Sequence, residues 1–367
     1  MGKLTRLIHD ISKNFKILEE VSGASVESSN LLKKSTTIHY ENYLESILGY
    51  SSRNISVHYP EVYRYVLRNC YIVGQQGFVF TSRNKIVSDK SEFIYEKKRK
   101  IRFPIPLMAK KVSGIAFHLA GKNYENHGHF VSQFLPRLII EREYLLSNPQ
   151  VKVILSKGQS SWQKRYLNML GISTDRIIET DYGTIQIEKL IYIPFFHGTD
   201  SLVSNLDYKK LIPLFDAHKK SVKKTKTNVI FLSRENAPNR RIINEEEVIK
   251  LISKIMKTDV AKIFLEEFSL KQQIELFDNS SHIFGAQGQA FIGCLFSRNA
   301  CFTIMDNVAS KKLKRDWTVS FRNLSIHSEN MASRLYADTK LKEDRSWVQP
   351  LKPLAEHLEK LQELRLF

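Results

Sequence analysis

Two histidines and an arginine lie close together in one short stretch of the chain. The segment NYENHGHFVSQFLPRL (123–138) places His127 and His129 on either side of a glycine, with Arg137 eight residues further on. A histidine whose pKa is near neutrality can act as a general base, and an arginine can bind an anion. Such histidines can equally be structural, and no third ligand nearby suggests a metal site.

Arginines gather in a second segment, FLSRENAPNRRIINEEE (231–247). Ser233 and Arg234 stand at the end of a short apolar run, and Arg240 and Arg241 follow in the next turn. Because arginine forks match phosphate oxygens in a bidentate way, three arginines near one strand end predict a site for a diphosphate. The alternative is that these are surface arginines paired with the acidic run 245–247.

A third segment, HIFGAQGQAFIG (282–293), resembles the end of a strand, a glycine turn and the start of a helix. The N-terminus of a helix offers unpaired N–H groups and a favourable dipole end to an anion, and Gly288 would allow close approach of a ligand to the backbone. A glycine-rich connection without a ligand is the alternative. The spacing matches neither GxxxxGK[ST] nor GxGxxG.

These segments belong to a pattern of alternating strands and helices. In the first half we expect two short strands around a glycine turn at 71–82, followed by strands at 112–121, 151–156, 176–180 and 189–196 and helices at 129–146 and 162–171. In the second half we expect strands at 228–234, 261–267, 281–286 and 300–307 and helices at 244–256, 270–280 and 289–297, with Asn244 capping the first of these helices and Glu247 at its capping-box position. Short connections between alternating elements predict parallel sheets with helices on both faces.

The ends of the chain and the linker between its halves do not follow this alternating pattern. Apolar residues at helical spacing predict an amphipathic helix at 4–18, which either packs on the core or lies on a membrane surface. The lysine-rich stretch 216–227 predicts a linker, and leucines on one face predict a C-terminal helix. We therefore expect a helical, variable extension (1–65), a Rossmann-like domain (66–217), a second Rossmann-like domain (218–335) and a C-terminal helical segment (336–367).

The composition limits the class of protein. The net charge of +18 attracts anions, and it is concentrated at 96–102, 218–226 and 311–315, which could be solvated loop ends or contacts with anionic lipid headgroups. Three cysteines without a CxxC pair fit a reducing compartment and argue against a zinc site. We expect a cytoplasmic protein, because no apolar run is long enough for a membrane span and the first residues lack a secretory signal pattern. A basic nucleic-acid-binding protein is an alternative, but no helix-turn-helix, RRM or zinc-finger pattern supports it.

The three segments, in this order, resemble glycosyltransferase family 61. The segments NHGHFVSQFLPRL, FLSRENAPNRRIINEEEV and SLKQQIELFDNSSHIFGAQGQAFIGCLF carry the resemblance, which runs from about residue 123 to residue 307. The family includes plant xylosyl- and arabinofuranosyltransferases and bacterial capsule proteins. The resemblance implies a GT-B architecture, in which two Rossmann-like domains face a cleft and the C-terminal one binds most of the donor nucleotide.

The resemblance also implies roles for individual residues. His129, with His127 as the second candidate, would be the catalytic base, and Asn126 and Arg137 would lie on the acceptor side. The donor nucleotide and its diphosphate would be bound by Ser233, Arg234, Arg241, Asn244, Glu245, Gly285, Gln287, Gly288, Gln289 and Asp306. No cofactor or metal is implied beyond a nucleotide-sugar co-substrate, with a UDP-sugar favoured, and the chain contains no DxD triplet.

Three positions depart from the family pattern. Gln287 stands where the family has a histidine between two glycines, Gly293 replaces a helix asparagine, and Gln133 replaces an acid before LPRL. An amide cannot act as a base near neutral pH, so a catalytically impaired, sugar-binding member is an alternative. The main expectation is an inverting glycosyltransferase of bacterial surface polysaccharide synthesis. It would act on a glycan or lipid-linked glycan acceptor and make peripheral contact with an anionic membrane.

Overall fold

The computed structural model describes ten segments of the chain in two compact units. The described residues are 26–40, 55–81, 86–87, 104–121, 123–158, 162–181, 183–195, 228–297, 299–311 and 331–363. Unit 1 comprises Met1–Thr37 and His58–Asn205, and unit 2 comprises Ile38–Val57 and Leu206–Phe367. The predicted helix at 4–18, the predicted linker and the basic runs 96–102 and 218–226 lie outside the described residues, as does all of 311–315 except Lys311.

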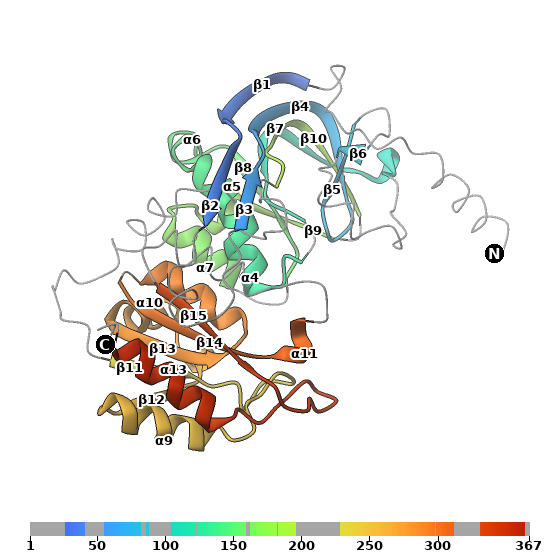
Figure 1. The fold of residues 1–367 in the computed structure, drawn as a ribbon. Helices are drawn as coiled ribbons and strands as arrows, with labels where there is room; N and C mark the ends of the chain where they lie inside the picture. Colours follow the sequence, from blue (N-terminus) through green and yellow to red (C-terminus); the bar gives the residue numbers. More distant parts are fainter. Residues whose placement is uncertain are drawn as a thin grey trace, which may run out of the picture. The chain divides into compact units, whose positions relative to one another are not determined.

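Unit 1 is built on a mixed sheet (Figure 1). Its strands are β1 (Val26–Lys33), β4 (Val62–Val73), β5 (Phe78–Phe80), β6 (Ile86–Val87), β7 (Lys110–His118), β8 (Lys152–Ser156), β9 (Ile177–Thr180) and β10 (Thr184–Tyr192). The order is β6-β5-β4-β10-β7-β8-β9, with β1 paired to β4. Only β10, β7, β8 and β9 run parallel, while β10 joins β4 antiparallel.

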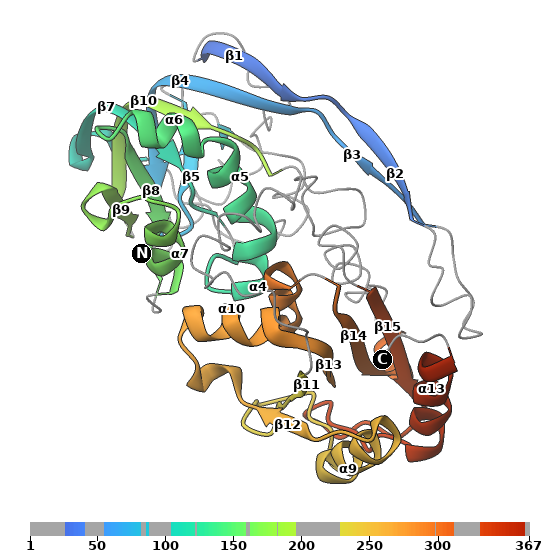
Figure 2. The same cartoon turned by 90° about the vertical axis from the view of Figure 1, so that its left-hand side faces the viewer.

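The sheet of unit 1 therefore departs from the predicted parallel one, and the described part of 1–65 consists of strands rather than helices. The long strand β4 explains both differences, because it pairs antiparallel with β10 on one side and with β1 and β5 on the other. Two further strands, β2 (Thr36–Tyr40) and β3 (Ile55–Tyr59), pair with each other (Figure 2). The hairpin turn predicted within 71–82 is confirmed, with Gly74 and Gly77 both at positive φ.

The helices of unit 1 follow the parallel strands. They are α4 (His127–His129), the π-helical turn η3 (Phe130–Phe134), α5 (Leu135–Ile140), α6 (Arg142–Ser147) and α7 (Trp162–Met169), with short 3₁₀ turns η2 (Pro106–Met108) and η4 (Thr174–Arg176). The single helix predicted at 129–146 is thus divided. A π-helical turn widens the backbone locally, and such turns are frequent at functional sites.

Unit 2 is a parallel sheet covered on both faces. Its strands are β11 (Asn228–Leu232), β12 (Val260–Ile263), β13 (Ser280–Ala286), β14 (Cys301–Asn307) and β15 (Met331–Ala337). Its helices are α9 (Glu245–Met256), α10 (Leu270–Asn279), α11 (Val308–Lys311) and α13 (Leu351–Glu363), with 3₁₀ helices η6 (Leu265–Glu267) and η7 (Gln289–Phe296). All four strand pairs are parallel, as predicted, although β15 was not predicted and η7 is a 3₁₀ helix rather than an α-helix.

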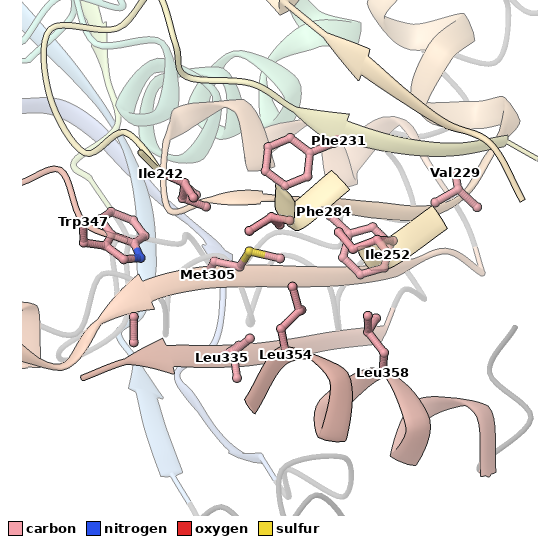
Figure 3. Packing of buried hydrophobic residues seen from close by; sticks show 13 residues of the cluster. Val229, Phe231, Ile242, Ile252, Phe284, Met305, Leu335, Trp347, Leu354 and Leu358 are labelled. Carbon is pink, nitrogen blue, oxygen red and sulfur yellow. The ribbon is translucent and has the colours of Figure 1, made fainter. Parts of the chain in front are cut away.

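Figure 1 shows α9 and α13 on one side of this sheet and α10 on the other. The core beneath α9 and α13 is drawn in Figure 3, where Phe231, Phe284 and Met305 of the sheet meet Ile252 of α9 and Leu354 of α13. These apolar side chains are fully or almost fully buried. Burial on both faces explains why the strands have nearly continuous apolar sequences, which made the parallel sheet predictable.

Candidate functional site

The strand order of unit 2 reverses direction between β11 and β13. The order is β12-β11-β13-β14-β15, so the chain first adds β12 on one side of β11 and then builds outward from its other side. In doubly wound sheets, ligands bind at such a switch point, beyond the carboxyl ends of the strands. Ser233 and Arg234 directly follow β11, and Gln287 and Gly288 directly follow β13. The structure thus brings together the second and third segments that the sequence singled out.

The guanidinium group of Arg234 lies against the backbone of Gly288. A Cβ atom at Gly288 would lie 2.4 Å from Nη1 of Arg234, so any side chain at this position would require the guanidinium group to move. Gly288 is also the residue that precedes η7, where backbone N–H groups lack helical partners. The two groups therefore present a cation and a helix N-terminus at one place.

Arg234 is hydrogen-bonded to a backbone carbonyl group rather than to a carboxylate. Its Nη2 donates to the carbonyl oxygen of Asn239 at 3.1 Å, while its Nε is buried and donates to no group in the described structure. No carboxylate of a described residue pairs with it. Burial, followed by the charge of Arg240, lowers the pKa of Arg234 to about 10, which still leaves the side chain charged at neutral pH. A partly buried cation with an unsatisfied N–H is suited to an anionic ligand.

Arg240 completes the cationic pair. Its backbone has a left-handed conformation (φ 57°) and its N–H donates to the carbonyl oxygen of Asp344 at 3.0 Å. Burial lowers the pKa of Arg240, and the nearby carboxylate of Asp306 opposes this shift. A non-glycine residue in this conformation is strained, and such strain collects at functional sites.

Arg241, which the resemblance placed at the diphosphate, is engaged in an ion pair. Its Nη2 is 2.7 Å from Oδ2 of Asp344, in an exposed ion pair. The backbone around it is fixed by the segment 344–349, because the N–H of Arg241 donates to Oγ of Ser346 and the N–H of Trp347 donates to the carbonyl oxygen of Arg241. The charge of Arg240, by contrast, acts on Arg234, and Arg240 was one of the three arginines that the sequence pattern assigned to a diphosphate.

Acidic residues beside the arginines form ion pairs with one lysine. Lys262 of β12 is 2.7 Å from carboxylate oxygens of both Glu235 and Glu246, and 3.3 Å from Glu245. Glu245 also accepts a hydrogen bond of 2.5 Å from Ser233 Oγ. The carboxylates of the ENAPNRRIINEEE stretch that lie nearest to β12 are thus paired with Lys262. Among the described residues neither Arg234 nor Arg240 forms a salt bridge, although the charges of Glu266 and Asp306 act on them.

The remaining predicted residues of unit 2 have structural contacts. Asn244 precedes α9 as predicted, but its side chain does not cap the helix: Nδ2 donates to the carbonyl oxygen of Gln349 (3.0 Å) and Oδ1 accepts from the Gln349 N–H (2.8 Å). Gly285 lies within β13, where a Cβ would approach the Leu232 carbonyl oxygen to 2.8 Å. Gln287 is buried, and its N–H donates to the carbonyl oxygen of Met305.

Two further residues lie at the same edge of the sheet. Gln289 is the first residue of η7 and is half-buried. Asp306, near the end of β14, is buried and accepts a hydrogen bond from the N–H of Asn307 at 2.8 Å. It is the one predicted acidic residue whose charge reaches Arg240.

In unit 1, the first segment forms the start of the divided helix. Asn126 caps α4, because its Oδ1 accepts a hydrogen bond from the N–H of His129 at 3.0 Å. Nδ1 of His129 is 3.0 Å from Oε1 of Gln133, one turn further along. Since that oxygen only accepts, Nδ1 is the donor of this contact, and in the neutral ring Nε2 then has the lone pair that could take a proton from a hydroxyl group.

His127 has a more enclosed setting. Its Nε2 is 3.0 Å from the hydroxyl of Tyr166, and its ring packs edge-on against Trp162 at 5.2 Å. Burial lowers the pKa of His127 to about 4, so the ring is neutral at neutral pH. The His127 side chain packs against Trp162 and contacts the Tyr166 hydroxyl, so His129 is the better candidate for the base.

Arg137 is a fully buried cation of unit 1. Its Nη2 donates to the carbonyl oxygen of Ala120 at 3.3 Å and its Nη1 to that of Ile193 at 3.4 Å. The guanidinium carbon also lies 3.9 Å from the ring centre of Phe195. These contacts join the loop after β7 to the segment after β10, so Arg137 supports the backbone that precedes α4.

The comparisons with known proteins agree with these segments. Residues 127–304 match the family model Glycosyltransferase 61, which supports the resemblance to that family. The match supports a transferase that binds a sugar donor and an acceptor. A search of curated proteins found no match.

One solved structure is similar to part of the chain. It is described as "The active site of a carbohydrate esterase displays divergent catalytic and non-catalytic binding functions", with 12% identity over 39% of this chain and 67% of that chain. The TM-score of 0.23 is too low for this likeness to carry an argument. Among the described residues, no helix is long and apolar enough to cross a membrane.

Proposed function

We propose that the protein is an inverting glycosyltransferase that transfers a hexosyl or pentosyl group from a nucleotide sugar to a hydroxyl group of a glycan. The observation that carries this proposal is the pair Arg234 and Arg240 at the switch point of unit 2, neither of which forms a salt bridge with a described residue. The family match supports the class of reaction, and the two arginines support the proposal of a donor diphosphate at this edge of the sheet.

In the proposed reaction, unit 2 binds the donor and unit 1 activates the acceptor. The acceptor oxygen forms a bond to the anomeric carbon while the bond from that carbon to the diphosphate breaks. Nε2 of His129 takes the proton of the acceptor hydroxyl. The leaving diphosphate gains negative charge, which Arg234, Arg240 and the N-terminus of η7 stabilise where it develops.

Several finer features belong to the same proposal. The two units would form a GT-B architecture, fixed arginines would serve in place of a metal ion, and a UDP-sugar is the favoured donor. A lipid-linked or growing surface polysaccharide of a bacterium is the proposed acceptor. The enzyme would then work in the cytoplasm in peripheral contact with an anionic membrane, which the net charge of +18 supports.

Turnover with a panel of UDP-, GDP-, CMP- and dTDP-sugars and glycan acceptors tests this proposal. We expect one donor to support transfer, His129→Ala to lose turnover while still binding that donor, and His127→Phe to retain turnover, because the His127 ring is neutral and packed. Unchanged turnover in His129→Ala would end the assignment of the base.

A second candidate is a catalytically impaired member that binds nucleotide sugars. Gln287 and Gln133 favour it, since both replace ionisable residues of the family pattern and the Gln133 side chain contacts His129. An amide can orient an imidazole but stabilises its protonated form less than a carboxylate does. Donor binding without any turnover across the panel would support this candidate over the enzyme.

A further inference from the structure

Unit 1 exposes three large apolar side chains within four residues. The exposed fractions are 54% for Ile105, 100% for Leu107 and 78% for Met108. They surround the 3₁₀ turn η2, directly before β7. Scattered apolar residues are normal on a protein surface, but a contiguous group marks an interaction site.

The backbone of this segment, which we call the apolar apex (Ile105–Met108), is fixed to the sheet. The N–H of Ile105 donates to Oγ1 of Thr184 at 3.0 Å, and the N–H of Met108 donates to the carbonyl oxygen of Ile105 at 3.0 Å. The N–H of Ala109 closes the turn on Pro106 at 3.2 Å. The apex is thus a built turn at the start of a strand, which presents its side chains outward.

Positive charge surrounds the apex on both sides in the sequence. Lys110 and Lys111 follow it, are exposed, and form no ion pair with any residue that the structure describes. Five lysines and arginines precede it within 97–102. Asp181, an acidic residue close in sequence to Thr184, accepts a hydrogen bond from the N–H of Gly183. Apolar side chains with basic neighbours match the interface of an anionic bilayer, where the former enter the acyl region and the latter contact headgroups.

We propose that the apolar apex inserts into the interface of an anionic lipid bilayer, with Lys110 and Lys111 in contact with lipid phosphates. This site deepens the membrane contact of the proposed function, but it does not depend on the donor site. The apex belongs to unit 1 and none of its residues has a role in the proposed chemistry. Failure of glycosyl transfer would therefore not affect the proposed membrane insertion. Failure of membrane binding would likewise not affect the proposed transferase activity.

Sedimentation of the full chain with vesicles tests this proposal. The probes are phosphatidylcholine vesicles with and without phosphatidylglycerol, at low salt. We expect the wild-type protein to bind only the anionic vesicles, Leu107→Asp/Met108→Asp to weaken this binding about tenfold, and Lys110→Glu/Lys111→Glu to weaken it by a similar factor. Val348→Asp changes a half-exposed apolar residue of unit 2 and serves as the matched control, with binding unchanged.

Three results would overturn the proposal. The wild-type protein could fail to bind anionic vesicles, or the Leu107→Asp/Met108→Asp variant could bind them as the wild type does. The third result is a dimer of the wild-type protein in sedimentation velocity that is lost in this variant. It would show that the apex binds a second copy of the chain. Circular dichroism melts confirm folding, and because both side chains are exposed we expect no change in melting temperature.

Discussion

The guanidinium group of Arg234 lies so close to Gly288 that a Cβ atom there would be 2.4 Å from Nη1. Arg234 follows β11 and Gly288 follows β13, the two strands that flank the switch point of the unit 2 sheet. The contact explains why a glycine stands at position 288 and why the arginine can share the start of η7. We therefore expect the two positions to act together in ligand binding.

Gly288→Ala should therefore weaken donor binding by displacing Arg234. We expect the dissociation constant of the nucleotide to rise about tenfold, since a hydrogen bond to a charged group contributes about 1.5–3 kcal/mol. In Arg234→Met, the same glycine substitution should cost little, and this double-mutant cycle is measured by calorimetry. Additive losses from the two substitutions would show that the side chain and the glycine act separately.

Arg240 and Arg241 should differ although they are neighbours. Arg240→Met should raise the KM for the donor about tenfold, because it removes a charge that lies beside Arg234 and Asp306. Arg241→Met removes an exposed ion pair with Asp344, which contributes about 0–1 kcal/mol to folding, and should leave the KM almost unchanged. Initial rates over a range of donor concentrations measure both variants. The opposite ranking would restore Arg241 to the site.

Gln133→Glu should change the pH dependence of the reaction. The substitution places a carboxylate beside the Nδ1–H of His129, which lies 3.0 Å from the present amide oxygen. A carboxylate favours the protonated ring, so the acid limb of the kcat/KM profile should move to higher pH. A pH–rate profile of both proteins measures this. If the two profiles coincide, Gln133 does not position the base.

Gly293→Asn, which restores the family residue, should destabilise the protein. A Cβ at position 293 would lie 2.1 Å from atoms of the Phe277 ring, and overpacking a core costs about 1–3 kcal/mol. In a Phe277→Ala background the ring is gone, so the substitution should cost much less. Urea unfolding of the four proteins measures the coupling. An equal loss in both backgrounds would show that Phe277 is not the cause.

The elements of unit 2 were predictable because each rests on a local pattern. The strands β11, β13 and β14 are buried on both faces and have almost continuous apolar sequences, and the capping box of Ser269 and Gln272 marks the start of α10. Unit 1 was less predictable. The antiparallel pairing of β4 with β10 joins residues more than 100 positions apart, which no local pattern encodes.

The site was predicted at the level of segments but not of every side chain. The sequence singled out NRR, but the choice between its arginines depends on Asp344, which lies 103 residues further along the chain and binds Arg241. The π-helical turn after His129 and the packing of Phe277 on Gly293 are likewise tertiary effects. The physical consequences of the departures from the family pattern at Gln133 and Gly293 therefore become clear only when the residues that contact them are known.

The most direct test of the central claim is the binding of nucleoside diphosphates to the wild-type protein and to Arg234→Met. A thermal-shift screen with UDP, GDP and dTDP selects the nucleotide, and calorimetry then gives the dissociation constants, with Arg241→Met as the matched control. We predict saturable binding that weakens about tenfold or more in Arg234→Met and stays unchanged in the control. Equal affinity of Arg234→Met and the wild-type protein, or no binding by the wild-type protein, would contradict a diphosphate site at the switch point.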